Sequence, residues 1–113
     1  MKKFLVLYLA PATVLEEWMR KPEENRKAGE EKMKKEWDTW MESHRDVIKE
    51  TAGAGKTKKV TKEGVTDTKN DIMLYSIVEG ESAEAVAEMF RDHPHFGIPE
   101  ASIEIMPVNY LSE

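Results

Sequence analysis

The chain has 113 residues, of which 40% are hydrophobic and 35% charged, and its formal net charge at pH 7 is −5; this predicts one domain, residues 1–113, with a single core. The sequence contains no cysteine, which excludes a disulfide framework, a thiolate metal site and a cysteine nucleophile. The acidic balance, with basic residues interleaved among acids, predicts that nucleic acid is not a partner.

The first predicted element is a strand at residues 3–9, where apolar, β-prone residues occupy both parities. Neither face of such a strand meets water, so we expect it at the centre of a sheet. The apolar run at residues 4–10 is much shorter than a membrane span, and no small-residue cleavage pattern follows it. We therefore expect no membrane partner and a cytoplasmic protein.

Two helices are predicted next, with a proline between them. Thr13 and Glu16 form a capping-box pattern for a short helix. A longer helix is expected to start at Pro22 and to run to about Glu50. Gly53, shortly after it, can adopt the left-handed conformation that ends a helix. The apolar stripe of this helix, at spacings of three, four and seven, consists of Met33, Trp37, Trp40, Met41, Val47 and Ile48.

The second half of the chain predicts three strands and one helix. Residues 56–61 form a lysine-rich strand whose charges suit a solvent-exposed edge. Residues 72–78 are apolar on both parities, which predicts the second central strand. Ser82 is expected to cap a helix that Pro94 stops. Residues 101–108 alternate apolar and polar side chains, which predicts a final edge strand.

The order β-α-β-β-α-β predicts an α+β, ferredoxin-like fold with a four-stranded antiparallel sheet. Right-handed crossovers place the first and third strands in the centre and both helices on one face. The other face of two strongly apolar strands is then left uncovered. We expect a second copy of the chain to cover it, so that the protein is a homodimer through its sheet face.

Segments spread over nearly the whole chain carry a family resemblance. They are residues 4–8, the helix from Trp37 to Gly53, residues 75–82, residues 93–96 and residues 102–108. In these segments the chain resembles the YCII-related family, also called the DGPF family, of the dimeric α/β-barrel superfamily. The resemblance implies a ferredoxin-like fold, a homodimer that forms a dimeric α/β barrel, and a cleft between the sheet and the helices.

The chain departs from this family at two places. Glu63-Gly64-Val65-Thr66 stands where the family has its Asp-Gly-Pro-Phe segment. Some members carry a histidine in the first long helix, with a partner aspartate, as proposed catalytic residues, whereas this chain offers Glu36 or Trp37. The fold that the resemblance implies therefore brings no activity with it.

Polar residues that could carry chemistry gather after the last predicted helix, at Asp92, His93 and His95. A neutral imidazole beside a carboxylate can exchange protons near neutral pH, which makes His95 the candidate catalytic residue. The alternative is a helix end at which the imidazoles cap carbonyls or pack locally. No distant third ligand accompanies the two histidines, so we expect no metal site.

The candidate ligand-binding residues are aromatic or lie beside aromatic residues. Trp37 and Trp40 can stack on an aromatic ligand, although tryptophans three apart on an amphipathic helix also suit a core. His44 follows Trp40 by four residues and could point into a cleft or complete the buried stripe. His93 and Phe96 complete the candidate set.

Three functions are compatible with these residues. The leading expectation is a homodimeric domain that binds a small organic molecule in a cleft near residues 93–96. One alternative is a lyase or isomerase that uses His95 for proton transfer and needs no cofactor. The other is a structural or interaction module without a site.

Overall fold

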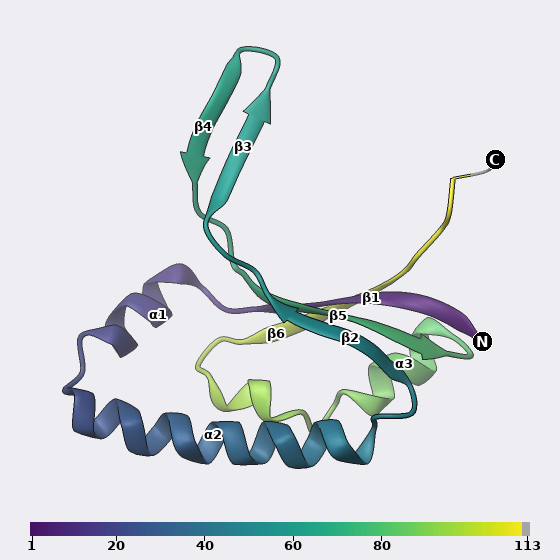
Figure 1. The fold of residues 1–113 in the computed structure, drawn as a ribbon, viewed down its shortest axis with the longest axis horizontal. Helices are drawn as coiled ribbons and strands as arrows, with labels where there is room; N and C mark the ends of the chain where they lie inside the picture. The colour runs from purple at the N-terminus through teal and green to yellow at the C-terminus, as the bar shows by residue number, and fades with distance from the viewer. Residues whose placement is uncertain (112–113) are drawn as a thin grey trace.

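The structure is a computed structural model that describes residues 1–111 (Figure 1). In chain order its elements are β1 (Lys2–Leu9), α1 (Ala12–Met19), α2 (Glu23–Ser43), β2 (Ile48–Gly53), β3 (Thr57–Thr61), β4 (Gly64–Thr68), β5 (Ile72–Gly80), α3 (Ala83–Met89), the 3-10 helix η1 (Pro94–Gly97) and β6 (Ser102–Pro107). No helix within residues 1–111 is both long enough and apolar enough to cross a membrane.

The main sheet has four strands in the order β2-β5-β1-β6, and every neighbouring pair is antiparallel. This confirms the predicted α+β, ferredoxin-like arrangement. It also confirms β1 and β5 as the central strands and β6 as one edge. The register pairs Val6 of β1 with Ser76 of β5 and with Ile105 of β6, so these side chains share one face.

The other edge strand is not the predicted one. The helix expected to reach Glu50 ends at Ser43, and β2 pairs with β5 from Ile48 onward. Val47 and Ile48 suit a helical stripe and a strand equally well, because short apolar runs do not distinguish the two. Pairing with β5 decides between them, as Glu79 N–H donates to the Val47 carbonyl at 2.8 Å. Gly53 consequently ends a strand rather than a helix.

Residues 56–61, predicted as the edge strand, form a strand in a different place. β3 and β4 make a separate two-stranded hairpin, which stands away from the main sheet in Figure 1. Lysines and threonines suit this hairpin because nearly all of it is exposed. Lys58 and Asp67 form an ion pair across its two strands.

The helix starts agree with the sequence in part. Ser82 caps α3, as predicted, because its hydroxyl accepts a hydrogen bond from Ala85 N–H at 3.1 Å. The capping box predicted at Thr13 is wrong. Helix α1 begins after Pro11, whose carbonyl accepts from Val14 N–H at 3.0 Å, so Thr13 already lies inside the first turn.

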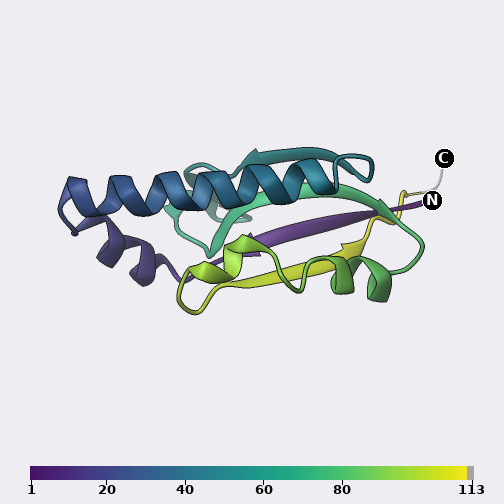
Figure 2. The same cartoon turned by 90° about the horizontal axis from the view of Figure 1, so that it is seen from below.

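The helices lie on one face of the sheet (Figure 2), and the core lies between that face and the helices. Tyr8 and Phe90 belong to it, and each fully buried large side chain stabilises the fold by about 1.5–3 kcal/mol. Its other buried members are Phe4, Val6, Trp40, Val78 and Val86.

Gly80 of β5 packs closely against Val86 of α3, and we predict that Gly80→Ala destabilises the fold. A Cβ there would lie 2.4 Å from Val86 Cγ2, and Val86 is itself buried. We expect a loss of about 1–3 kcal/mol in denaturant unfolding, because overpacked cores must shift. Gly53→Ala is the matched control, since its Cβ would meet nothing within 4 Å. Equal stabilities for the two variants would contradict this prediction.

Candidate functional site

The loop between α3 and β6 brings two histidines into the core. His93 precedes Pro94, which favours extended backbone at His93, and its φ and ψ are −65° and 139°. In this position the His93 Nδ1 accepts a hydrogen bond from His95 N–H at 2.9 Å. The histidine thus caps η1 with its own ring, and its exposed fraction is only 2%.

His95 connects this loop to the end of the first strand. Its Nε2 lies 2.8 Å from the Leu9 carbonyl oxygen, and the residue has an exposed fraction of 0%. Because a carbonyl only accepts, the proton of the neutral His95 ring resides on Nε2, and Nδ1 carries no proton. By the same reasoning His93, which accepts at Nδ1, carries its proton on Nε2.

The imidazoles lie within an aromatic cluster, which we define as Tyr8, Trp37, Trp40, Phe90, His93 and His95. The His93 ring centroid lies 4.3 Å from that of Trp37 and 4.4 Å from that of Trp40, in edge-to-face arrangements. Tyr8 contributes a ring from the sheet, 5.3 Å from His93 and 5.6 Å from His95. The topology therefore unites α2, β1 and the η1 loop at one point.

Burial keeps both imidazoles neutral. It lowers the pKa of His93 to about 3, and the neighbouring His95 and His44 add to this effect while Asp92 opposes it. Burial also lowers the pKa of His95, against the raising effect of backbone groups of Leu9 and Ser102. Neutral imidazoles can donate or accept a proton, whereas imidazolium ions can only donate one.

Three buried polar atoms of the cluster have no hydrogen-bond partner among the residues that the structure describes. They are His93 Nε2, His95 Nδ1 and Trp40 Nε1. Such an atom costs about 1–3 kcal/mol when it is left unsatisfied, although an N–H pointing at an aromatic face recovers part of this. The cluster thus presents two N–H donors and one acceptor.

Of the two cluster residues that were not predicted as site residues, Phe90 and Tyr8, it is Tyr8 that adds a polar group. Its hydroxyl lies 2.7 Å from Ser76 Oγ, which in turn lies 2.7 Å from Thr51 Oγ1. This polar chain crosses β1, β5 and β2, and burial raises the pKa of Tyr8 to about 12. The available signal was parity, because Tyr8 shares its face with Phe4 and Val6.

An open groove runs along α2 beside this cluster. Its volume is about 580 Å³, and Trp40, His44, Asp92 and Pro94 form the part nearest the histidines. The remaining lining residues, all from α2, are Lys32, Lys35, Glu36, Thr39 and Ser43.

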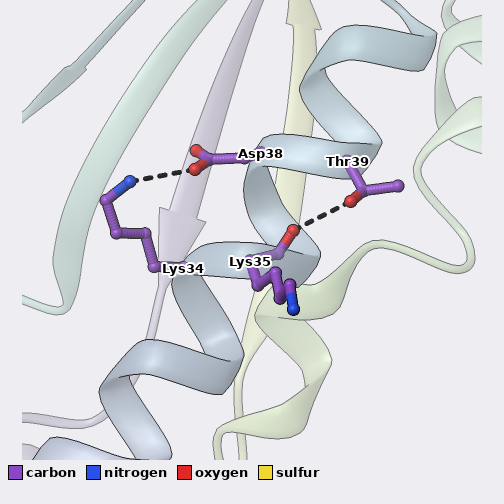
Figure 3. A network of polar contacts seen from close by, with 4 residues as sticks. All are labelled: Lys34, Lys35, Asp38 and Thr39. Carbon is purple, nitrogen blue, oxygen red and sulfur yellow. Dashed lines mark hydrogen bonds and ion pairs between the residues drawn. The ribbon is translucent and has the colours of Figure 1, made fainter.

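Contacts within α2 already occupy some of the polar groups of this groove. The Thr39 hydroxyl donates to the Lys35 carbonyl at 2.9 Å. Lys34 and Asp38, which do not line this groove, form an ion pair elsewhere on the helix surface (Figure 3). The His44 ring stacks on Trp40 with centroids 4.0 Å apart, and its Nδ1 donates to the Trp40 carbonyl at 2.8 Å.

The predicted site residues thus fall into two groups. Trp37, Trp40, His93 and His95 lie in the cluster, and His44 lies against it. Phe96 has an exposed fraction of 46%, and its ring centroid lies 6.3 Å from that of His95. Residues 1–111 contain no group of three or more histidine, aspartate or glutamate side chains that could hold a metal ion.

The low pKa of His93 predicts that the fold weakens in acid. In the unfolded chain the His93 ring has a pKa of 6.5 and is protonated below that pH, whereas in the folded chain it stays neutral down to about pH 3. His93 therefore contributes its full stability above pH 6.5 and loses it progressively as the pH falls from 6.5 towards 3. Between pH 7.5 and pH 5 we expect a loss of about 2 kcal/mol from this residue.

Urea unfolding at both pH values measures this loss. In His93→Asn, whose Oδ1 can still accept from His95 N–H, that part of the pH dependence should vanish. The ring signals of His93 in NMR spectra should also stay unshifted between the two pH values. A His93 ring that titrates near its ordinary value would contradict the assignment.

Comparisons with known proteins give distant likenesses among solved structures. No family model matches the chain, and no curated protein matches it in sequence. Among solved structures it is similar to 5-chloro-2-hydroxyhydroquinone dehydrochlorinase from Burkholderia phenoliruptrix, solved in complex with 2,5-dihydroxybenzoquinone. The identity is 12%, the alignment covers 92% of this chain and 91% of that chain, and the TM-score is 0.46. Similarity at this level transfers neither activity nor ligand.

Proposed function

We propose that the chain binds a small organic molecule where the groove meets the aromatic cluster. The observation that carries this proposal is the set of unpaired buried polar atoms on His93, His95 and Trp40. Buried polar groups in folded proteins nearly always have a partner, so three exceptions in one cluster favour a ligand that supplies the partners. A molecule entering from the groove would meet Trp40 first, and because neither buried histidine lines the groove, side chains there must shift before it reaches them.

The chemistry of the cluster favours a planar ligand that carries hydroxyl or carbonyl groups. Trp37, which is half-buried, offers an aromatic face on which a flat ring can stack, whereas Trp40 already stacks on His44 and would contribute mainly its indole edge. His93 Nε2–H and Trp40 Nε1–H can donate to an oxygen atom, and His95 Nδ1 can accept from a hydroxyl. A mostly apolar site with a few polar groups is typical of small-molecule pockets.

A proton-transfer enzyme of the lyase or isomerase kind is the second candidate. The favouring observation is that His95 holds its proton on Nε2, against the Leu9 carbonyl, so Nδ1 is available as a base. Its lowered pKa keeps the ring neutral at physiological pH, which a general base requires.

A purely structural role is the third candidate. His93 and His95 are almost fully buried, and each makes one hydrogen bond that holds the η1 loop in place. In this account the unpaired nitrogen atoms are a cost that the aromatic packing offsets.

We also propose that two copies pair through their sheets to form a dimeric α/β barrel. The helices lie on one face of the sheet in Figure 1, and the opposite face carries apolar side chains that are only partly buried. They include Leu5, Leu7, Leu9, Tyr75, Ile77 and Met106. Membership of the YCII-related family, whose resemblance implies such a dimer, is part of the same proposal.

Titration with hydroquinone, a planar ring with two hydroxyl groups, tests the ligand site. We expect the indole N–H signal of Trp40 to shift, while that of Trp18 on α1 stays in place. Cyclohexane-1,4-diol, which has the hydroxyl groups but no aromatic face, should cause no shift. The proposal fails if hydroquinone and a panel of related ring compounds leave Trp40 unmoved and protein isolated from cells carries no bound molecule by native mass spectrometry.

The variant His95→Gln separates a binding role from a structural one. Its amide nitrogen can still donate to the Leu9 carbonyl, but the acceptor at the Nδ1 position is lost. We expect at least a tenfold loss of hydroquinone affinity, about 1.4 kcal/mol, with the melting temperature nearly unchanged. Arg45→Gln, which lies after α2 and alters a different groove, is the control. Unchanged affinity with a lowered melting temperature would favour the structural account.

Light scattering after size exclusion should give the mass of a dimer. Leu7→Asp should reduce it to that of a monomer, because it places a charge between the two apolar sheet faces. Val6→Ala is the matched control. Val6 neighbours Leu7 but faces the helices, so its truncation should lower stability without changing assembly. A monomer mass for the wild-type protein would refute the pairing.

A further inference from the structure

The chain is less compact, and exposes more surface, than a globular monomer of its size. Its radius of gyration is 16.1 Å, whereas a compact chain of this length has about 13 Å. It exposes 8457 Å², whereas a monomer of its mass exposes about 6300 Å². The excess of about 2100 Å² per chain is of the size that permanent dimers bury.

Part of this excess lies in residues 56–69, which we call the arm and which comprise β3, β4 and their flanks. All arm residues except Thr57 are exposed. A two-stranded hairpin in water is marginally stable unless something packs against it. At its outer end the cross-strand pair Val60 and Val65 is exposed by 73% and 64%, so the arm ends in an apolar patch.

The charge of the arm is opposite to that of the remaining chain. The arm holds five lysines and two acids, a net charge of +3, so the other residues together carry −8. The uncovered sheet face carries Glu50 and Glu104, which pair in register with Ile77 and Leu7, whereas Glu79 on the same face is balanced by Lys3 opposite it and by an ion pair with Lys49 at 3.5 Å. A second copy of the chain is therefore an electrostatically favourable partner for the arm.

The arm also stands on the correct side of the sheet. It continues from β2 and β5 at the end where Gly53 and Ile72 lie, and it rises on the side opposite α2 (Figure 1). The uncovered face points to this same side. A second sheet laid on that face would lie alongside the arm.

We propose that the arm of each chain packs its Val60 and Val65 patch against a second copy of the chain and so clamps the dimer. The inference rests on the proposed pairing of the sheets and adds a second contact region to it. Lys58 and Asp67 lie on the same face of the hairpin as the two valines, because alternate residues of a strand share a face.

The double variant Val60→Thr with Val65→Thr tests the clamp. Threonine has the shape and strand preference of valine, so the hairpin should persist while its apolar patch disappears. We expect the dimer dissociation constant, measured by sedimentation, to rise about tenfold or more. Thr66→Ser, on the opposite face of the arm, should leave it unchanged.

A labelled arm gives an independent reading, because the chain has no cysteine of its own. Bimane attached to Val65→Cys should shift its emission to the blue as the protein concentration rises through the dissociation constant. The same label on Lys34→Cys, exposed on α2, should not shift. This measurement does not depend on the stability of the double variant.

The outcomes distinguish the arm from the sheet pairing. A wild-type dimer that Leu7→Asp dissociates, with no effect of the arm variants and no shift of the label, would overturn the clamp and leave the pairing intact. A wild-type monomer would overturn both. A label that responds to DNA or phospholipid vesicles, but not to protein concentration, would assign the arm to another partner and also overturn the inference.

Discussion

The ring of Tyr8 is the contact on which the arrangement of the structure depends. From the middle of the sheet it touches Trp37 of α2, Phe90 at the end of α3 and both buried histidines. The Tyr8 hydroxyl lies 2.7 Å from Ser76 Oγ in the neighbouring strand, while the ring packs against the helices and the loop. A single side chain thus contacts both layers and the loop that carries the histidines.

The aromatic packing around Tyr8 also restricts what the imidazoles can do. An imidazolium ion in this environment would lose its hydration without gaining a carboxylate close enough to offset the loss, so the neutral forms prevail. The hydrogen bonds of His93 and His95 then fix which nitrogen carries the proton. Any chemistry at this cluster must therefore use a neutral ring that presents one donor and one acceptor.

The sequence predicted the features that local patterns determine. The central strands followed from apolar residues on both parities, and the α3 cap followed from Ser82. The boundary between α2 and β2 did not, because Val47 and Ile48 satisfy both periods and only pairing with β5 selects the strand. The neighbourhood of Trp37, Trp40 and His95 was predictable from topology, whereas burial of both histidines depends on side-chain packing that no local pattern encodes.

Strands β2 and β5 connect the cluster to the arm without making the two interdependent. Within the sheet they carry Thr51 and Ser76, which complete the polar chain from Tyr8, and beyond it they continue into β3 and β4. The cluster is buried on the helix side, while the tip of the arm is exposed on the other side (Figure 1). Sites that share no contacts behave additively. Changes at Val60 and Val65 should therefore alter assembly, and changes at His95 should alter ligand affinity, each without the effect of the other.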